Sequence, residues 1–454
     1  MTASKPTDIR IREIRTSETT YLYRTPFKFG GRTGSKATLL AVDCEVETRD
    51  GRRARGSGSM PLGNSWAFPS PTLDYEQTLA VMKTLAGRCA ALAQAHAEFG
   101  HPIDLGVQLE EKFLAAALDL GTELKLAQPI PKLATLVTGS PFDAALHDAF
   151  GKAHGRNCYH TYGRDFMSRD LGAYLGRDYD GVWLEPYVLR EPAPTLPLYH
   201  LIGALDPLTA ADVTKPVGDG LPEDLPEWIR ANGLSHLKIK LNGDDLAWDL
   251  ERVVAADRIA GETPRAPGAE AWRYSLDFNE RCQNVEYLVE MLRKLRERSP
   301  QGFDRVQYVE QPTARDLRAN PQNKMHAAAK LRPVVIDESL TDLESLLLAQ
   351  EMGYTGAALK ACKGQSQSLL LAAAAQRLGL FLCVQDLTCP GASLIQSASL
   401  AAHIPGVSGI EANSRQYCPV ANQGWDERFP GIFQISDGRM HTEGIRGPGL
   451  GATS

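Results

Sequence analysis

Short apolar runs that each stop at a charged residue recur along the second half of the chain. Segments with helical spacing of apolar residues separate one run from the next. Strand-length apolar runs that alternate with helical segments are typical of parallel βα units. The residues that end the runs are Lys240, Asp277, Glu310, Asp337, Lys360, Asp386 and Glu411.

One further apolar run, at 200–204, lies upstream and brings the predicted strands to eight. Eight βα units close into a (β/α)8 barrel, whose active site lies at the C-terminal ends of the strands. We therefore predict an α/β protein built on a TIM-type barrel, with the charged residues at its mouth. A single charge after a strand is usually solvated or caps the next helix, but seven in succession favour a functional site.

The composition excludes several classes of protein. A chain of 454 residues with 43% hydrophobic content suffices for a large core and two domains. The formal net charge of -6 gives no indication of nucleic-acid or membrane binding, and no apolar run approaches the roughly 20 residues that span a membrane. Eight cysteines without CxxC spacing, and an N-terminus without an apolar segment, predict a reduced cytoplasmic protein.

The N-terminal third of the chain predicts an α+β capping domain. Residues 9–14 and 38–46 have strand patterns, and Asp50 followed by Gly51 is a hairpin turn signal. Between the two strands, residues 25–32 contain two aromatic residues and two glycines. This composition suits a mobile loop over a ligand, or else an ordinary surface loop.

Helical spacing follows at 75–99 and 107–120. Ser140 as N-cap and Pro141 at the first helical position predict the start of another helix, which runs to His154. The predicted organisation is a capping domain at 1–155, a connection at 156–197, the barrel at 198–420 and a return to the capping domain at 421–454.

Asp277, Glu310 and Asp337 end three consecutive predicted strands. Their carboxylates would converge at the barrel mouth and repel one another unless a cation lies between them. A site built from oxygen ligands alone suits a hard divalent ion, most simply Mg2+. The alternative is a buried ionic network between these acids and the lysines of other strands.

Lys238 and Lys240 lie two residues apart on one predicted strand, so both side chains point to the barrel mouth. Lys360 ends a strand across the barrel. A neighbouring metal or ammonium group lowers the pKa of a lysine and prepares it to act as a general base. Two lysines on opposite sides of a metal could remove a proton from one face of a carbon and return it to the other. The alternative for each lysine is a role as counter-ion for the acids.

The barrel motifs resemble those of the enolase superfamily, and within it the mandelate racemase and muconate-lactonizing enzymes. The most specific are Lys-Ile-Lys, Asp-Phe-Asn, Val-Glu-Gln-Pro and Ile-Asp-Glu-Ser, at 238–240, 277–279, 309–312 and 336–339. The resemblance extends to the N-terminal strands, the helix before the barrel and the C-terminal tail, so it covers nearly the whole chain.

The resemblance implies that the three consecutive acids bind Mg2+ and that Lys240 and Lys360 are bases, as in the muconate-lactonizing branch. It places Lys238 near the substrate carboxylate, and the spacing from the last acid favours Lys360 over Lys363. The family chemistry is abstraction of the proton α to a carboxylate, with Mg2+ stabilising the enediolate. A small carboxylate substrate and a homo-oligomer are also implied.

Two strand ends depart from relatives within that family. The seventh strand ends at Gln385 and Asp386 without a histidine, unlike the mandelate racemase branch and many sugar-acid dehydratases. The eighth carries Glu411 and Asn413 instead of the Asp-x-Asp of dipeptide epimerases. We expect Asp386 and Glu411 to contact the substrate.

The favoured function is therefore a Mg2+-dependent racemase, epimerase or cycloisomerase of a small carboxylate. Dehydration of a sugar acid is the main alternative, with loss of a β-hydroxyl after removal of the α-proton. A Schiff-base aldolase and a non-catalytic binding protein are further alternatives.

Overall fold

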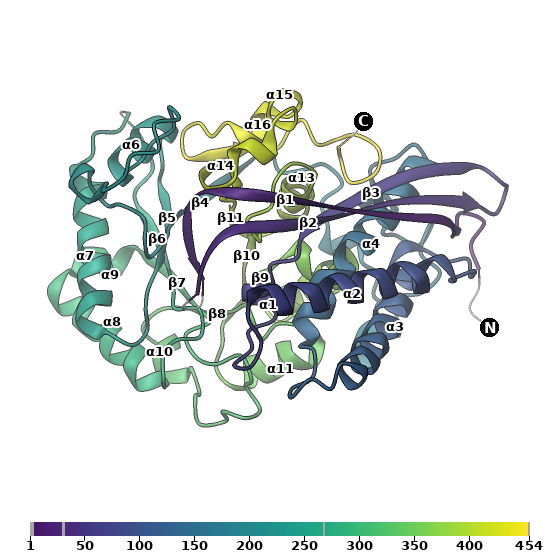
Figure 1. The fold of residues 1–454 in the computed structure, drawn as a ribbon, viewed down its shortest axis with the longest axis horizontal. Helices are drawn as coiled ribbons and strands as arrows, with labels where there is room; N and C mark the ends of the chain where they lie inside the picture. Colours follow the sequence, from purple (N-terminus) through teal and green to yellow (C-terminus); the bar gives the residue numbers. More distant parts are fainter. Residues whose placement is uncertain (1–3, 30–31, 267, 453–454) are drawn as a thin grey trace.

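A closed barrel of eight parallel strands forms the larger part of the molecule (Figure 1). The computed structural model describes residues 4–29, 32–266 and 268–452. The barrel strands follow one another in sequence order, and the last pairs with the first. They are β4 (Thr195–Ile202), β5 (His236–Lys240), β6 (Arg273–Asp277), β7 (Val306–Glu310), β8 (Val334–Ile336), β9 (Gly356–Leu359), β10 (Phe381–Gln385) and β11 (Val407–Glu411). This arrangement confirms the predicted fold.

Helices cover the outside of the barrel, so most strand residues are buried, whichever face they lie on. Asp224, Asp245, Asn284 and Asp342 begin four of these helices as N-caps, because each side chain accepts a hydrogen bond from a free backbone N–H. The helices are α6 (Leu225–Asn232), α7 (Leu246–Glu262), α8 (Val285–Arg298), α9 (Pro300–Arg305), α10 (His326–Ala329), α11 (Leu343–Glu351), α12 (Gln365–Arg377) and α13 (Ala392–His403).

The barrel interior is a packed core. Tyr199 and Tyr308 lie edge to face with ring centroids 5.7 Å apart, and they pack with Val335, Ala358 and Cys383. All five side chains are buried. This layer closes the barrel, so the charged residues at the strand ends face a chamber with an apolar floor.

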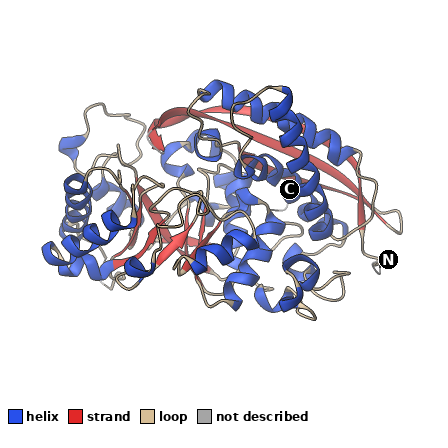
Figure 2. Ribbon diagram, turned by 90° about the horizontal axis from the view of Figure 1, so that it is seen from below, coloured by secondary structure: helices blue, strands red, loops and turns tan. Residues whose placement is uncertain are grey.

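A three-stranded antiparallel sheet and four helices form the capping domain (Figure 2). Helix α4 lies directly on β3 at Gly56 and Gly58. A Cβ atom added to Gly58 would lie 2.1 Å from the carbonyl oxygen of Pro141, so only glycine permits this approach. The elements are β1 (Ile9–Phe29), β2 (Arg32–Thr48), β3 (Arg53–Pro61), α1 (Asn64–Ala67), α2 (Tyr75–Gln94), α3 (Pro102–Glu123) and α4 (Lys132–Ala153).

The prediction of a loop at 25–32 is wrong for the residues that the structure describes. Strand β1 continues to Phe29 and β2 begins at Arg32, with a register shift between Leu22 and Phe27. Aromatic and β-branched residues at 19–23 extend the strand. Gly30 and Gly31 lie outside the described residues. The hairpin reaches from the capping domain to the barrel mouth (Figure 1), where Phe27 packs on Leu201 and Tyr417.

The predicted helix start at Ser140 is also wrong, because Pro141 lies inside α4. Proline lacks the N–H that would bond the carbonyl of Val137 in a continuous helix. The hydroxyl of Ser140 donates to that carbonyl at 2.9 Å instead, so the helix continues past the proline.

Short elements make up the connection and the tail. Asp437 and Gly438 have positive φ angles and form the turn before β12, which pairs antiparallel with the start of β4. The tail then reaches the capping domain, where the N–H of Leu450 donates to Asp148 Oδ1 at 3.0 Å. The short elements are η1 (Cys158–Thr161), α5 (Gly172–Leu175), η2 (Arg177–Tyr179), η3 (Glu185–Tyr187), η4 (Ala210–Asp212), η5 (Ala361–Lys363), α14 (Ser414–Tyr417), η6 (Pro419–Asn422), α15 (Trp425–Arg428), α16 (Pro430–Phe433) and β12 (Arg439–His441).

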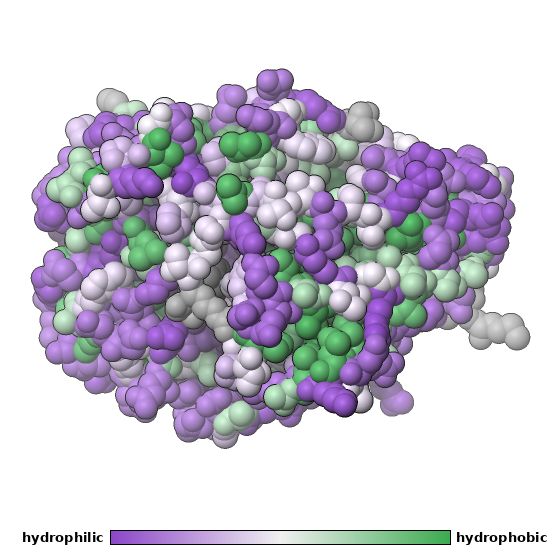
Figure 3. Space-filling view, in the orientation of Figure 1, coloured by the Kyte–Doolittle hydropathy of each residue, from purple (hydrophilic) through white to green (hydrophobic). Residues whose placement is uncertain are grey.

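The surface in Figure 3 is largely hydrophilic, with hydrophobic side chains gathered near α1 and α2. The eight cysteines are all buried and free. Within the described residues, none of the helices combines the length and the apolar character that crossing a membrane requires.

Candidate active site

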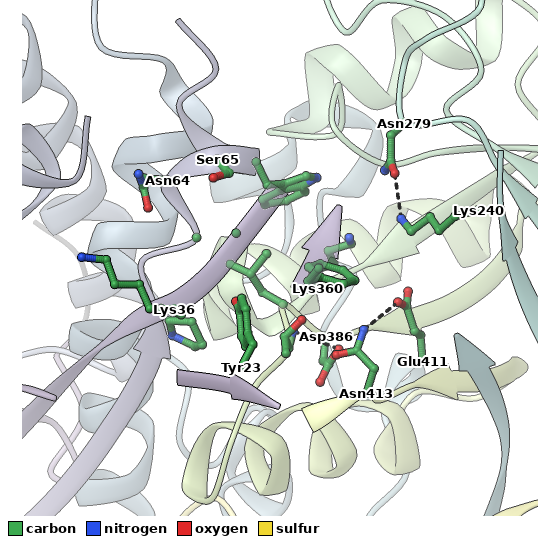
Figure 4. A pocket seen from close by; sticks show the side chains of 18 of the residues that line it. Tyr23, Lys36, Asn64, Ser65, Lys240, Asn279, Lys360, Asp386, Glu411 and Asn413 are labelled. Carbon is green, nitrogen blue, oxygen red and sulfur yellow. Dashed lines mark hydrogen bonds between the residues drawn. The ribbon is translucent and has the colours of Figure 1, made fainter. Parts of the chain in front are cut away.

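A cavity of about 730 Å3 lies between the capping domain and the barrel mouth (Figure 4). The capping hairpin contributes Tyr23 and Phe27, and α1 contributes Trp66. The barrel contributes most of the predicted site residues, namely Lys238, Lys240, Asp337, Lys360, Asp386 and Glu411. The cavity therefore belongs to both domains.

The structure gathers the predicted site residues at one end of the barrel. Each of the seven run-ending residues is the last residue of its strand or follows it directly. All are at most 5% exposed, as is Lys238. Lys240 pairs with Asp277 in register across β5 and β6, and Asp277 pairs with Glu310 across β6 and β7. The register of the parallel strands brings these charges side by side.

Lys238 lies at the centre of the acidic group. Its Nζ is 3.1 Å from Asp277 Oδ2, 2.8 Å from Glu310 Oε1 and 2.6 Å from Glu411 Oε2. Burial lowers the pKa of Lys238, but the three carboxylates outweigh burial and raise the pKa well above its usual value. Lys238 is therefore held as an ammonium ion in this arrangement.

The carboxylates have pKa values shifted in opposite directions. Burial raises the pKa of Asp277, but the ammonium groups of Lys238 and Lys240 outweigh it, so the net shift is downward. Burial, followed by repulsion from Asp277, raises the pKa of Glu310 well above its usual value. The acids thus repel one another at short range, as the sequence predicts.

Lys240 faces the cavity from β5. Its ammonium group donates to Asp277 Oδ2, and to Asn279 Oδ1 at 2.9 Å (Figure 4). The amide nitrogen of Asn279 donates to Glu338 Oε1 at 3.3 Å. Asn279 has a φ angle of 43°, in the left-handed region that Asn tolerates better than most residues. Asn279 therefore orients Lys240 and links it to Glu338.

Lys360 and Lys363 both contact Asp337. Lys360 Nζ lies 2.9 Å from Asp337 Oδ2, whereas Lys363 Nζ donates to the backbone oxygen of Asp337 at 2.5 Å. Burial lowers the pKa of Lys360, but Asp337 outweighs it and raises the pKa. Burial lowers the pKa of Lys363. Lys360 lines the cavity, while Lys363 lines a separate cavity of about 410 Å3 between the capping helices and α12.

The acids and lysines together form a buried ionic network. Among the described residues, no three Asp, Glu, His or Cys side chains are gathered in a form that could hold a metal ion. The donor chemistry nevertheless fits a hard divalent cation, because Asp277, Glu310 and Asp337 bring carboxylates from neighbouring strand ends. Asp337 Oδ2 is buried and accepts no hydrogen bond, although the Lys360 ammonium lies beside it.

Asp386 and Glu411 line the side of the cavity beside β10 and β11. Asp386 accepts hydrogen bonds from the backbone N–H groups of Thr388 and Cys389, at 3.2 and 3.0 Å. Burial, followed by repulsion from Glu411, raises the pKa of Asp386 to about 7. Asn413 donates to Glu411 Oε1 at 3.2 Å and also lines the cavity.

Two contributors were missed as individual site residues in the sequence. Asn279 belongs to the Asp-Phe-Asn motif, and its spacing from Asp277 is a signal that would have found it. Trp66 lines the cavity from the capping domain, far from the barrel in sequence. No local pattern distinguishes Trp66 from an ordinary core tryptophan.

Comparisons with known proteins agree with this architecture. The sequence family described as enolase C-terminal domain-like matches residues 221–454. A comparison of the sequence with curated proteins gives no significant match.

Solved structures of similar fold include three proteins with named activities. Muconate lactonizing enzyme from Pseudomonas fluorescens, complexed with muconolactone, is 19% identical with a TM-score of 0.62, covering 98% of this chain and 96% of its own. Dipeptide epimerase from Enterococcus faecalis, complexed with Mg and L-Leu-L-Tyr, is 16% identical with a TM-score of 0.62, covering 98% and 100%. N-succinyl Arg/Lys racemase from Bacillus cereus is 16% identical with a TM-score of 0.63, covering 97% and 95%. The chain belongs to the enolase superfamily, in the family of the mandelate racemases and muconate lactonizing enzymes.

Proposed function

We propose that the protein is a Mg2+-dependent isomerase that removes the proton α to the carboxylate of a small molecule. One observation carries the proposal: Lys240 and Lys360 face the same cavity from β5 and β9. These strands are four apart in a ring of eight, so they lie on opposite sides of the barrel. Bases on two sides of one carbon suit racemisation, epimerisation or cycloisomerisation.

The named activities of the similar structures support this reaction type. They are a lactonizing enzyme, a dipeptide epimerase and an amino-acid racemase, and one of them was solved with Mg. Asp277, Glu310 and Asp337 would hold Mg2+ in this protein. A bound divalent cation stabilises the negative charge that develops on a carboxylate as its α-proton leaves.

The chain's own residues bind the substrate and move the proton. Lys238, already surrounded by carboxylates, supplies positive charge beside the substrate carboxylate. Lys240, oriented by Asn279, exchanges the proton on one face, and Lys360 does so on the other. When Asp337 binds the cation, its carboxylate stabilises the ammonium form of Lys360 less. Burial then favours the neutral amine that a general base requires.

Asp386 and Glu411 are proposed to contact the part of the substrate away from the metal. Both are buried, acidic and on the cavity wall. Their carboxyl groups and the neighbouring Asn413 provide hydrogen-bonding groups that select among carboxylates of similar size.

Deuterium exchange tests the proposal. The protein is incubated with Mg2+ in D2O and a panel of N-acyl amino acids, dipeptides, sugar acids and muconolactone, and the α-carbon is followed by NMR. We expect deuterium to enter without loss of water, and EDTA to abolish the exchange. A protein carrying both Lys240→Ala and Lys360→Ala controls for contaminating enzymes. Exchange that persists in EDTA contradicts the metal requirement, and a product that has lost water identifies a dehydratase.

A further inference from the structure

The indole ring of Trp66 lies over Lys360 and Lys363, the two lysines that follow β9. The indole ring centroid lies 4.6 Å from Lys360 Nζ and 5.8 Å from Lys363 Nζ. The indole N–H donates to Glu338 Oε1 at 3.0 Å. Trp66 is only 2% exposed, although it belongs to the capping domain and not to the barrel. One side chain from the capping domain thus contacts three ionisable groups of the barrel mouth.

The backbone around Trp66 is fixed from two sides. In the capping domain, the side-chain amide of Asn64 donates to the backbone oxygen of Tyr75 at 2.9 Å and to Thr78 Oγ1 at 3.0 Å. From the barrel, Arg315 donates to the backbone oxygen of Trp66 at 3.1 Å, and the same guanidinium is paired with Glu280 at 2.6 Å. The indole ring is therefore held by both domains.

The start of α1 admits little adjustment. Gly63, its N-cap, has a φ angle of 53°, a left-handed conformation that glycine adopts without strain. A Cβ atom there would lie 2.5 Å from Leu387 Cδ2, a residue on the cavity wall. Glycine at position 63 thus lets α1 lie directly against Leu387 in the segment after β10.

A lysine has four rotatable bonds, so an ammonium held by one carboxylate alone can adopt several positions. The face of Trp66 limits these positions by attracting the cation and excluding water above it. Trp66 is related to the two lysines in different ways, since its ring face lies over Lys360, whereas Lys240 donates to Asp277 and Asn279 and is linked to the indole N–H through Asn279 and Glu338.

We propose that Trp66 is a positioning residue for Lys360, which aims this lysine at one face of the substrate carbon. This inference rests on the proposed function for the role of Lys360 and extends it to the capping domain. The ring face carries the effect, whereas the indole N–H serves Glu338. Phenylalanine at position 66 keeps a ring face, and leucine removes it.

The test compares Trp66→Leu and Trp66→Phe with the wild type and with Lys360→Ala. The α-proton exchange in D2O is measured separately for the two enantiomers of N-acetyl amino acids. Lys360→Ala identifies the enantiomer whose exchange depends on Lys360. We expect Trp66→Leu to slow that enantiomer about 10- to 100-fold more than the other, and Trp66→Phe to restore exchange to within about threefold of wild type. Equal slowing of both enantiomers by Trp66→Leu would overturn the inference.

A second readout needs no substrate. The proteins are labelled with acetic anhydride, and the modified fraction of each lysine is measured by mass spectrometry. We expect Trp66→Leu to change the labelling of Lys360 at least about threefold, with Trp66→Phe and wild type alike and with Lys36, on the cavity rim, unchanged. Unchanged labelling of Lys360 refutes the positioning role. Absence of exchange in the wild type with every carboxylate of the panel, together with altered labelling, refutes the proposed reaction and leaves the positioning role intact.

Discussion

Lys360 and Lys363 show how position within a few ångströms assigns a role to one of two similar residues. Both lie at Asp337, and both are buried. Lys360 lines the cavity between the domains, whereas Lys363 turns to the backbone oxygen of Asp337 and to the cavity behind it. The structure therefore supports Lys360 as the residue that can reach a substrate.

Replacing each lysine separately tests this distinction. Lys360→Ala should lower α-proton exchange about 10²- to 10⁴-fold, the range that a general base contributes. Lys363→Ala should leave exchange within about tenfold of wild type while lowering the melting temperature, because the buried oxygen of Asp337 loses a donor. Exchange rates and thermal melts of both variants are the measurement. An equal loss of exchange in Lys363→Ala would transfer the role to Lys363.

Asp386 gives a prediction for pH. Its pKa of about 7 exceeds the usual value of 3.8, because burial and Glu411 disfavour its charged form. Between these values the folded chain retains a proton that the unfolded chain has lost, so this group makes the protein less stable as pH rises. In the Asp386→Asn variant, the free energy of unfolding should fall less between pH 5 and pH 8 than in wild type, by at most about 3 kcal/mol. Urea unfolding at both pH values measures the difference, and parallel behaviour of the two proteins would contradict the raised pKa.

At the scale of elements, the contact between α4 and β3 depends on the absence of side chains at Gly56 and Gly58. Gly58→Ala should destabilise the protein by about 1–3 kcal/mol or more, because the added methyl group meets backbone atoms that cannot move away. Gly87→Ala is a matched control on the exposed face of α2, where an added Cβ atom meets nothing within 4 Å. It should stabilise the helix by up to about 1 kcal/mol. Thermal denaturation of the two variants should therefore shift in opposite directions.

The elements that could be predicted from sequence are those whose signal is local. Strands β5 to β11 can be predicted because each is an apolar run with a charged residue at its end. The register of the parallel strands then brings Lys240, Asp277 and Glu310 together. The predicted helix start at Ser140 was wrong because serine followed by proline is typical of a helix N-terminus. In this chain the Ser140 hydroxyl donates to the Val137 carbonyl that Pro141 cannot bond, so the helix continues. Trp66 could not be predicted, because its function depends on how the capping domain sits on the barrel.

The strained turns at the barrel mouth escaped prediction for a related reason. Asn279, Glu280, Gln311 and Thr388 have positive φ angles directly after strands β6, β7 and β10. Only Asn is common in this conformation, so the sequence does not signal the other three. Hydrogen bonds between neighbouring strand ends stabilise these turns. For example, the backbone N–H of Glu280 donates to the backbone oxygen of Gln311 at 2.8 Å.

For the whole molecule, binding of Mg2+ to the folded chain predicts a gain in stability that needs no substrate. At 100 times the dissociation constant, a ligand that binds the folded state alone adds about 2.7 kcal/mol to the free energy of unfolding. Asp277→Asn should remove the response to Mg2+, whereas Asp386→Asn, outside the proposed ligand set, should retain it. Melting temperatures with EDTA and with Mg2+ measure both. A wild-type melting temperature that ignores Mg2+ would contradict the metal site.

The pairing of β4 determines when the barrel can be completed as the chain is made. Leu198 and Tyr199 in the middle of β4 pair with β11, and the start of β4 pairs with β12 near residue 440. During synthesis, the first barrel strand therefore waits for more than two hundred residues before its last partners emerge from the ribosome. Until then its hydrogen-bonding groups form an open sheet edge, the kind of surface that pairs with other chains. The capping domain is synthesised earlier, but its contact with Leu450 also forms only when the C-terminal residues have been made, so the end of the chain completes both domains.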